Sequence, residues 1–372
     1  MKEVPDFRKA RGRRYELYKL LTISVLAIVA GADDFEAMAA FVERKAPFLR
    51  EIGLLDDKRK PSHDLFRWIF MHLDSAGFSL VLGAWLEYSV ANLPLEINTE
   101  AVLPKRIHID GKSLRATRTQ AHTRSALQVV SAYVSNSQLC VGQLLIEEKS
   151  CEKTAIPILI DLIDVKDSIV TIDAAGTMRK VASKIWDKGG DYLLALKKNN
   201  RLLYQEVDDF FRVFDDTDLV SLPFETQENA HGRNEKRVCQ VISELQYFPD
   251  ALEWKGIQSL VRIKTQQTRG GKCMAETRYY ISSLPPDAKS LLQSVRKHWS
   301  VENNLHWSLD VSFNEDKSRL RQKNAASIFA ALRRFALALL KNIKISKNSI
   351  KSQRLEAAWD NQFLIKVFNI LN

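Results

Sequence analysis

The chain has 372 residues, of which 45% are hydrophobic and 27% are charged, a composition that excludes a disordered chain. Its 55 Lys and Arg residues outnumber its 45 Asp and Glu residues, which favours a polyanionic partner, nucleic acid before a membrane surface. The four cysteines and seven histidines form no CxxC, HExxH or tight cluster, so we expect neither disulfides nor a zinc site, and a reducing cytoplasm fits.

The chain up to about residue 98 predicts helices, because its apolar stretches lack the alternation of a strand. The apolar run at residues 20–31 falls short of the roughly 20 residues that a membrane-spanning helix needs, and no cleavage pattern of small residues follows it. We therefore expect a buried helix there. Ser62 is the expected N-cap of a helix that starts after Pro61. Together these elements predict an all-helical N-terminal domain over residues 1–100.

The pattern changes after Pro104 to strands that alternate with helices, which predicts a mixed sheet covered by helices. We predict, in chain order, a strand at 106–110 that ends in Asp110, a hairpin of strands at 126–135 and 138–148, a helix at 154–164, a strand at 168–176 that contains Asp173, a helix stopped by Gly189 and Gly190, and a strand within 191–200.

Residues 201–285 predict a β-rich insertion, because a helix near 201–214 is followed by several alternating stretches. A helix is expected from about residue 288 to residue 307. These elements place the insertion within a domain of residues 101–372.

The positive charge is concentrated between residues 317 and 354, which hold eleven Lys or Arg residues and no Asp or Glu. The rest of the chain, with 44 basic and 45 acidic residues, is nearly neutral. Residues 325–340 are rich in Ala and Leu at helical spacing, so this basic segment contains a helix that either lines a DNA groove or has a solvated face around a core. Further basic clusters occupy residues 105–124 and 8–14.

Two aspartates, Asp110 and Asp173, follow isoleucine-rich strands, and chemistry in helix-covered sheets gathers beyond strand ends. Each alone is an ordinary turn residue. Together with a third acid they could hold two magnesium ions for phosphodiester chemistry, since Mg²⁺ prefers oxygen ligands.

Residues 295–316 offer candidates for the third acid, and Glu302 stands out among Asp310, Glu315 and Asp316. Four-residue intervals predict that His298, Glu302 and His306 share one helical face, next to Trp299 and Trp307. The alternative is an amphipathic core helix with a surface glutamate.

A set of motifs in a fixed order resembles the DDE transposases of bacterial insertion sequences, most closely the H-repeat-associated branch. The motifs are IDGK at 109–112, VTIDAAG at 170–176, YLLALKKN at 192–199, HGR at 231–233 and RKHWSVENNLHWSLDVSFNED at 296–316. The N-terminal segment with PSHD at 61–64 resembles that branch's associated domain. The resemblance therefore covers nearly the whole chain.

The resemblance implies an α/β, ribonuclease H-like mixed sheet with helices on both faces, a β-rich insertion and an all-helical N-terminal domain. It implies that Asp110, Asp173 and Glu302 are the catalytic triad and hold two Mg²⁺ ions, for which Mn²⁺ can substitute. The implied partner is double-stranded DNA, both transposon ends and target, with a homodimer in the synaptic complex, no membrane, and a location at the bacterial nucleoid. We expect DNA contacts from Lys105, Arg106, Lys112, Arg115, His298, Trp299, Arg319, Arg321 and Lys323.

The chain departs from the family pattern at a few positions. Met178 stands where relatives often have Gln, Asn200 ends a motif that usually ends in Gln, and Leu309 replaces a lysine. Three alternatives to an active transposase follow: a catalytically inactive or domesticated DNA-binding relative, a nuclease on the same fold such as a junction resolvase, and a membrane-surface protein. The first predicts salt-sensitive DNA binding without metal-dependent nicking.

Overall fold

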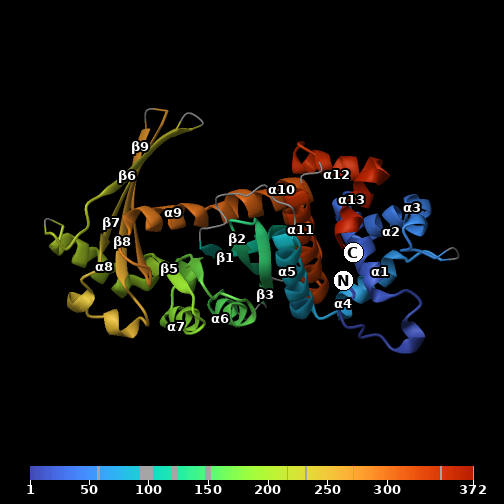
Figure 1. The fold of residues 1–372 in the computed structure, drawn as a ribbon, viewed down its shortest axis with the longest axis horizontal. Helices are drawn as coiled ribbons and strands as arrows, with labels where there is room; N and C mark the ends of the chain where they lie inside the picture. The colour runs from blue at the N-terminus through green and yellow to red at the C-terminus, as the bar shows by residue number, and fades with distance from the viewer. Residues whose placement is uncertain are drawn as a thin grey trace. The chain divides into compact units, whose positions relative to one another are not determined.

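A computed structural model describes residues 1–56, 59–92, 104–118, 125–146, 152–215, 217–230, 233–270, 272–343 and 346–371 (Figure 1). The chain forms two compact units. Unit 1 consists of Met1–Asn98, Gly111–Cys151 and Glu302–Asn372, and unit 2 consists of Thr99–Asp110 and Glu152–Val301. Strand β1 (Lys105–Leu114) contributes residues to both. The sequence-based boundary at residue 100 stays a prediction.

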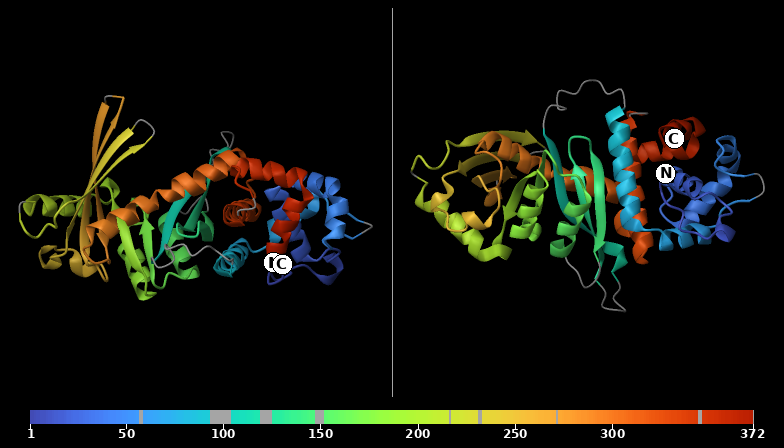
Figure 2. Two further views of the ribbon diagram at one scale, coloured as in Figure 1. Left: turned by 45° about the horizontal axis from the view of Figure 1, so that its top comes forward. Right: turned by 60° about the horizontal axis from the view of Figure 1, so that its bottom comes forward.

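Unit 1 is mainly helical and contains both ends of the chain, which lie close together (Figures 1 and 2). The expected N-terminal helices are present, and Ser62 caps α4 by accepting a hydrogen bond from the Leu65 backbone N–H at 3.3 Å. The helices of unit 1 are α1 (Leu17–Val29), α2 (Phe35–Arg44), α3 (Ala46–Glu51), α4 (His63–His72), α5 (Ser75–Asn92), α10 (Trp307–Phe313), α11 (Lys323–Ile343), α12 (Ile350–Trp359) and α13 (Asn361–Leu371).

Helix α11 is the centre of unit 1. It packs against α1, α4 and α5, and every residue from 325 to 340 is buried, including Arg333 and Arg334. The alternative of a core helix is therefore confirmed, whereas a solvated or DNA-lining face over residues 325–340 is wrong. Its arginines face carboxylates and carbonyl groups from other parts of the unit, which compensate the charge inside the protein.

The apolar run near the N-terminus lies in α1, where all residues from Leu20 to Val29 are buried, as expected. Within the described ranges no single helix is long and apolar enough to cross a membrane, although the bent pair formed by α4 and residues 75–88 passes by length and composition.

The predicted hairpin is present in unit 1 as antiparallel strands β2 (Leu127–Val134) and β3 (Leu139–Ile146). The strand order on this side is β3-β2-β1, and both α5 and α11 pack against β3. The hairpin is therefore covered by the helical core of the unit.

Unit 2 carries the sheet order β1-β4-β5-β9-β8-β7-β6. The pairs β1–β4 and β4–β5 are parallel, and each later pair is antiparallel. The strands are β4 (Ser168–Ile172), β5 (Asp191–Leu196), β6 (Phe224–Ala230), β7 (Arg233–Ile242), β8 (Ser259–Arg269) and β9 (Lys272–Ser282). This is the expected mixed sheet, and the β-rich insertion extends the sheet from β5 outward as a ribbon (Figure 2).

Helices cover both faces of the unit 2 sheet. Figure 1 shows α6 (Glu152–Leu162) and α7 (Arg179–Asp187) on one side of β5, and α9 (Ala288–His298) on the other. Helix α9 packs on β4, β5, β7 and β8, whereas α8 (Arg201–Val213) packs on β9. Gly189, with a φ of 75°, ends α7 as expected because its missing Cβ permits the left-handed conformation.

Strand β1 is longer than predicted. It runs through Asp110 to Leu114, although its pairing with β4 ends at Ile109 and Ile172. The extension is stabilised by burial of Lys112 and Leu114, two residues beyond the predicted end of the strand. From the sequence alone, a lysine is expected at the surface unless its acidic partners are known.

Candidate functional site

Asp110 and Asp173 come together in unit 2. Residues His108 and Thr171 are paired across β1 and β4, as are Ile109 and Ile172, so each aspartate is the next residue on its strand path. Alternate residues of a strand share a face, which places the two carboxylates on the face that also carries His108 and Thr171. Both aspartates are half-buried, and the Asp173 carboxylate accepts a hydrogen bond from the Ala175 backbone N–H at 3.0 Å.

A chain of hydrogen bonds lies directly beneath the two aspartates. The Thr171 hydroxyl contacts Nδ1 of His108 at 2.6 Å and Nδ1 of His298 at 2.8 Å. Since a hydroxyl has one proton and can accept two hydrogen bonds, at least one of the two ring nitrogens donates to it. The contact joins β1, β4 and α9 at one point, so it fixes the end of α9 on the sheet.

Burial favours the uncharged form of both His108 and His298 at neutral pH. Burial lowers the pKa of His298 to about 4, with Lys197 adding to the shift and Asp173 opposing it. Burial also holds the pKa of His108 well below its ordinary value, and the nearby cations and His298 act in the same direction. The DNA contact predicted for His298 stays a prediction, and at neutral pH it would be made without a positive charge. His298 is a neutral hydrogen-bonding group.

We expect the free energy of unfolding to decrease as the pH is lowered, because of the imidazole rings of His108 and His298. In the unfolded chain both titrate near pH 6.5, so below about that pH the unfolded state binds protons that the folded state does not. The free energy of unfolding should decrease as the pH falls below about 6.5, and the part due to His298 levels off below its pKa of about 4. Urea unfolding at a series of pH values measures this, and His298→Asn should show a shallower decrease. An identical slope in that variant contradicts the assignment.

Glu302 lies in unit 1 on a π-helical segment, Val301–His306, between α9 and α10. The helix predicted for residues 288–307 therefore exists with a wider turn in it. Glu302 is exposed whereas His306 is buried, so the predicted shared face of these two side chains is wrong. The π turn changes the angular spacing on which that prediction relied, and such turns are frequent at functional sites.

A cavity of about 510 Å³ in unit 2 adjoins the segment that follows Asp173. Ala174 and Thr177 line it, together with the cations Lys153 and Arg179. Asn199 also lines it and donates to the Ala174 carbonyl at 2.8 Å. Glu206 and Asp250 also line it, and Asp250 pairs with Arg179 at 2.9 Å, so the cavity offers charges of both signs and amide groups next to the segment that follows Asp173.

Two of the family departures, Met178 and Asn200, also line this cavity. The sequence marked their positions, but it did not reveal Lys153 or Arg179. Glu152, at the start of α6, was also missed; burial raises its pKa, and the Asp173 carboxylate contributes to the rise. His108 and Thr171 could have been found, because each stands two residues before one of the aspartates and so shares its face.

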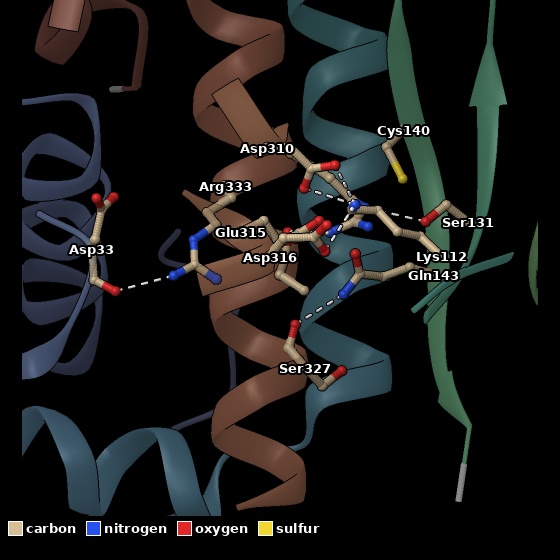
Figure 3. Close-up of polar contacts among 12 residues, drawn as sticks. Asp33, Lys112, Ser131, Cys140, Gln143, Asp310, Glu315, Asp316, Ser327 and Arg333 are labelled. Carbon is tan, nitrogen blue, oxygen red and sulfur yellow. Dashed lines mark hydrogen bonds and ion pairs between the residues drawn. The ribbon is translucent and has the colours of Figure 1, made fainter. Parts of the chain in front are cut away.

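Two residues predicted to contact DNA are buried and form contacts within the protein instead. Arg106 is buried and its Nε donates to the Ser294 hydroxyl at 3.3 Å. Lys112 is buried between the carboxylates of Asp310, at 2.7 Å, and Asp316, at 3.3 Å (Figure 3). Neither side chain is exposed to DNA, so the predicted phosphate contacts at these two positions are wrong.

The other predicted contacts are more open. The Arg115 side chain is 83% exposed and pairs with Asp316, and Lys105 is half-buried. Trp299 is 43% exposed, with the Arg278 guanidinium 4.8 Å from its ring centroid. Arg319 is exposed and Arg321 is half-buried, whereas the side chain of Lys323 lies outside the described residues, as do Arg124 and residues 231–232 of the HGR motif.

The candidate metal ligands fit a hard cation by chemistry, because Asp110 and Asp173 offer carboxylate oxygens from one face of the sheet. In the part of the chain that the structure describes, however, no three His, Cys, Asp or Glu side chains gather closely enough to hold one ion. The sheet by itself therefore supplies two of the three expected carboxylates.

Comparison with known proteins identifies the family. The family described as Transposase DDE domain matches residues 103–340, and the one described as DDE_Tnp_1-associated matches residues 1–86. "Putative transposase YncI" of Escherichia coli O157:H7 is 34% identical, covering 98% of this chain and 92% of its own. "H repeat-associated putative transposase YhhI" of E. coli K12 is 32% identical, covering 98% and 95%.

A solved piggyBac transposase in a synaptic complex with hairpin DNA aligns over 95% of this chain and 82% of that chain, at 10% identity and a TM-score of 0.42, from which we draw nothing. The sequence matches cover nearly the whole length of both partners and carry the two motif aspartates within the matched DDE region. The chain therefore belongs to the family of transposases with a DDE domain, alongside H-repeat-associated members.

Proposed function

We propose that the protein is an active DNA transposase that cleaves DNA at transposon ends in a metal-dependent reaction and joins those ends to target DNA. The observation that carries the proposal is the pair Asp110 and Asp173, which lie side by side on one face of neighbouring parallel strands within the matched DDE region. A pair of half-buried carboxylates is costly to keep unless a cation or a hydrogen bond compensates it.

The proposed ligands of two divalent cations are Asp110, Asp173 and Glu302, with Glu302 supplied by the π-helical segment of unit 1. When bound, such cations polarise a phosphate and lower the pKa of a water molecule. The Ala175 backbone N–H orients the Asp173 carboxylate, and the contact of Thr171 with two histidines keeps α9 fixed on the sheet.

The cavity beside Asp173 is the proposed place of the DNA strand next to the scissile phosphate. Its Lys153 would neutralise phosphate charge, whereas Arg179 is paired with Asp250, and Asn199 holds the protein backbone at Ala174. Hydrolysis breaks one P–O bond and leaves a 3′ hydroxyl. That hydroxyl then attacks a phosphodiester of target DNA, forming one P–O bond and breaking another, so no ATP is consumed.

The test is an assay of cleavage and strand joining on DNA that carries candidate transposon ends, run with Mg²⁺, with Mn²⁺ and with EDTA. The proposal expects cleavage and joined products with either metal and none with EDTA. Because two ends react together, we also expect a protein dimer in the complex that joins them.

The inactive DNA-binding relative is the outcome to be distinguished. It gives salt-sensitive binding to end DNA with no metal-dependent products, whereas a junction resolvase would cut branched DNA without joining strands. Either result would replace the transposase assignment.

A further inference from the structure

Unit 1 contains a cavity of about 490 Å³ that the proposed catalytic role does not use. It is lined by residues 33–35, by the segment that follows α10, and by α11. Three of the lining residues, Lys317, Arg319 and Arg333, are cations that come from the basic segment of residues 317–354. The sequence pattern had left open what this segment contacts.

Arg333 is 2% exposed at the edge of this cavity, and its hydrogen bonding is incomplete. One guanidinium nitrogen donates to the Asp33 backbone carbonyl at 3.0 Å, a contact visible in Figure 3, and the group lies 5.1 Å from the Phe329 ring centroid. Its Nε is buried and has no hydrogen-bond partner among the described residues. A buried donor without an acceptor is costly, so this position favours an additional acceptor.

The charge around Arg333 is unbalanced. Arg334 pairs with Glu315, and Arg354 pairs with Asp33, so the ion pairs described here use one carboxylate for each of those two arginines. The described hydrogen bond of the Arg333 guanidinium goes to the Asp33 backbone carbonyl, which carries no net charge. The Glu315 and Asp33 carboxylates also attract Arg333, but each forms its described ion pair with another arginine, so two carboxylates serve three buried arginines next to the cavity.

The two acids that line the cavity are already occupied. The Asp33 carboxylate accepts from Arg354 at 3.0 Å and from the Asn314 side chain at 2.8 Å. The Asp34 carboxylate caps α2 by accepting from the Ala37 backbone N–H at 2.7 Å. Neither acid is the partner of the three lining cations in the described contacts, so the cavity retains a net attraction for an anion.

We propose that this cavity binds a phosphate group of the DNA backbone, with Lys317 and Arg319 at its mouth and Arg333 at its floor. The inference deepens the proposed function, since it assigns a DNA contact to a protein expected to act on DNA. A phosphate supplies charge for the unbalanced arginine and acceptor oxygens for its donors. The volume also accommodates the sugar attached to that phosphate.

The test uses the full chain with a fluorescein-labelled DNA duplex, and reads affinity from fluorescence anisotropy at several salt concentrations. The double variant Lys317→Gln/Arg319→Gln removes the two cations at the mouth, both of which are exposed. We expect roughly tenfold weaker binding and a log–log salt slope shallower by about two. The Arg333→Lys variant keeps the charge but loses the guanidinium fork, and should weaken binding without changing that slope.

The matched control is Lys347→Gln/Lys351→Gln, which changes the net charge equally at two exposed positions of the same unit. It should leave affinity within about twofold. Equal losses in both double variants would mean that only net charge matters, and would overturn the site. If instead inorganic phosphate raises the melting temperature of the unaltered protein but not of Lys317→Gln/Arg319→Gln, while DNA affinity is the same in both, the site takes free phosphate and the DNA assignment fails.

Failure of the proposed phosphate site and failure of the proposed transposase activity give different experimental results. At saturating protein concentration the Lys317→Gln/Arg319→Gln variant should still cleave end DNA with Mg²⁺. A protein that never cleaves, yet shows the expected loss of affinity in this variant, retains the phosphate site and loses the transposase assignment.

Discussion

Asp173→Asn is expected to lower the rate of end cleavage in Mg²⁺ by at least about a thousandfold, because an amide has one less negative oxygen for a divalent cation. Binding to end DNA should change by less than about twofold, since Asp173 is an acid and contributes no attraction to phosphate. A gel assay of cleavage with the anisotropy of the same labelled DNA measures both quantities. Full cleavage by this variant would remove Asp173 from the reaction.

Four further variants make this result specific. Glu302→Gln should be as inactive as Asp173→Asn, although the two residues lie in different units. Asp164→Asn and Glu51→Gln make the same chemical changes at exposed positions of unit 2 and unit 1, and should cleave normally. If Glu302→Gln cleaves while Glu152→Gln does not, the third acid is Glu152, whose carboxylate interacts with that of Asp173.

Arg334→Met is expected to destabilise unit 1 by about 3–5 kcal/mol, because it leaves the Glu315 carboxylate buried without its counterion. The two side chains are 1% and 0% exposed, and one Arg334 nitrogen donates to Glu315 at 2.8 Å and also to the Ala330 carbonyl at 3.0 Å. Its Nε donates to the Ser131 hydroxyl at 3.1 Å. The free energy of unfolding in urea measures the loss.

A double-mutant cycle separates the ion pair from simple packing. Arg334→Met/Glu315→Leu should be less destabilised than Arg334→Met, since no buried charge remains unpaired. Arg212→Met, at an exposed ion pair with Asp208 in unit 2, should cost less than about 1 kcal/mol. If the double variant loses as much stability as the two single losses combined, the pair is not coupled and the burial argument fails.

The sequence predicted elements whose signals are local. Apolar, β-rich runs located β2 and β3, the apolar run near the N-terminus located α1, and the Ser62 cap located the start of α4. Asp110 and Asp173 were found because isoleucine-rich strands precede them, and the paired register of β1 and β4 follows from the parallel order of such strands. In these cases the residues that decide the structure are neighbours in the chain.

The wrong predictions about charged residues share one cause, which is that the compensating partner is remote in the chain. Lys112 is separated by 198 residues from Asp310, and Arg354 by 321 residues from Asp33. When these distant carboxylates are not known, a buried lysine such as Lys112 is assigned to the surface. In the same way, a buried helix that contains arginines is assigned to DNA binding. Net charge counted along a segment therefore overestimates the charge that the segment presents to solvent.

The π-helical segment at Glu302 has a consequence for comparing this chain with its relatives. A π turn accommodates one extra residue, so side chains beyond it are rotated by about 100° relative to an uninterrupted α-helix. A homologue one residue shorter between Val301 and His306 would keep its helix but point a different side of α10 inward. An alignment that places a gap here would exchange interior and surface positions in α10. A one-residue insertion in this helix therefore rotates the side chains that follow it about the helix axis.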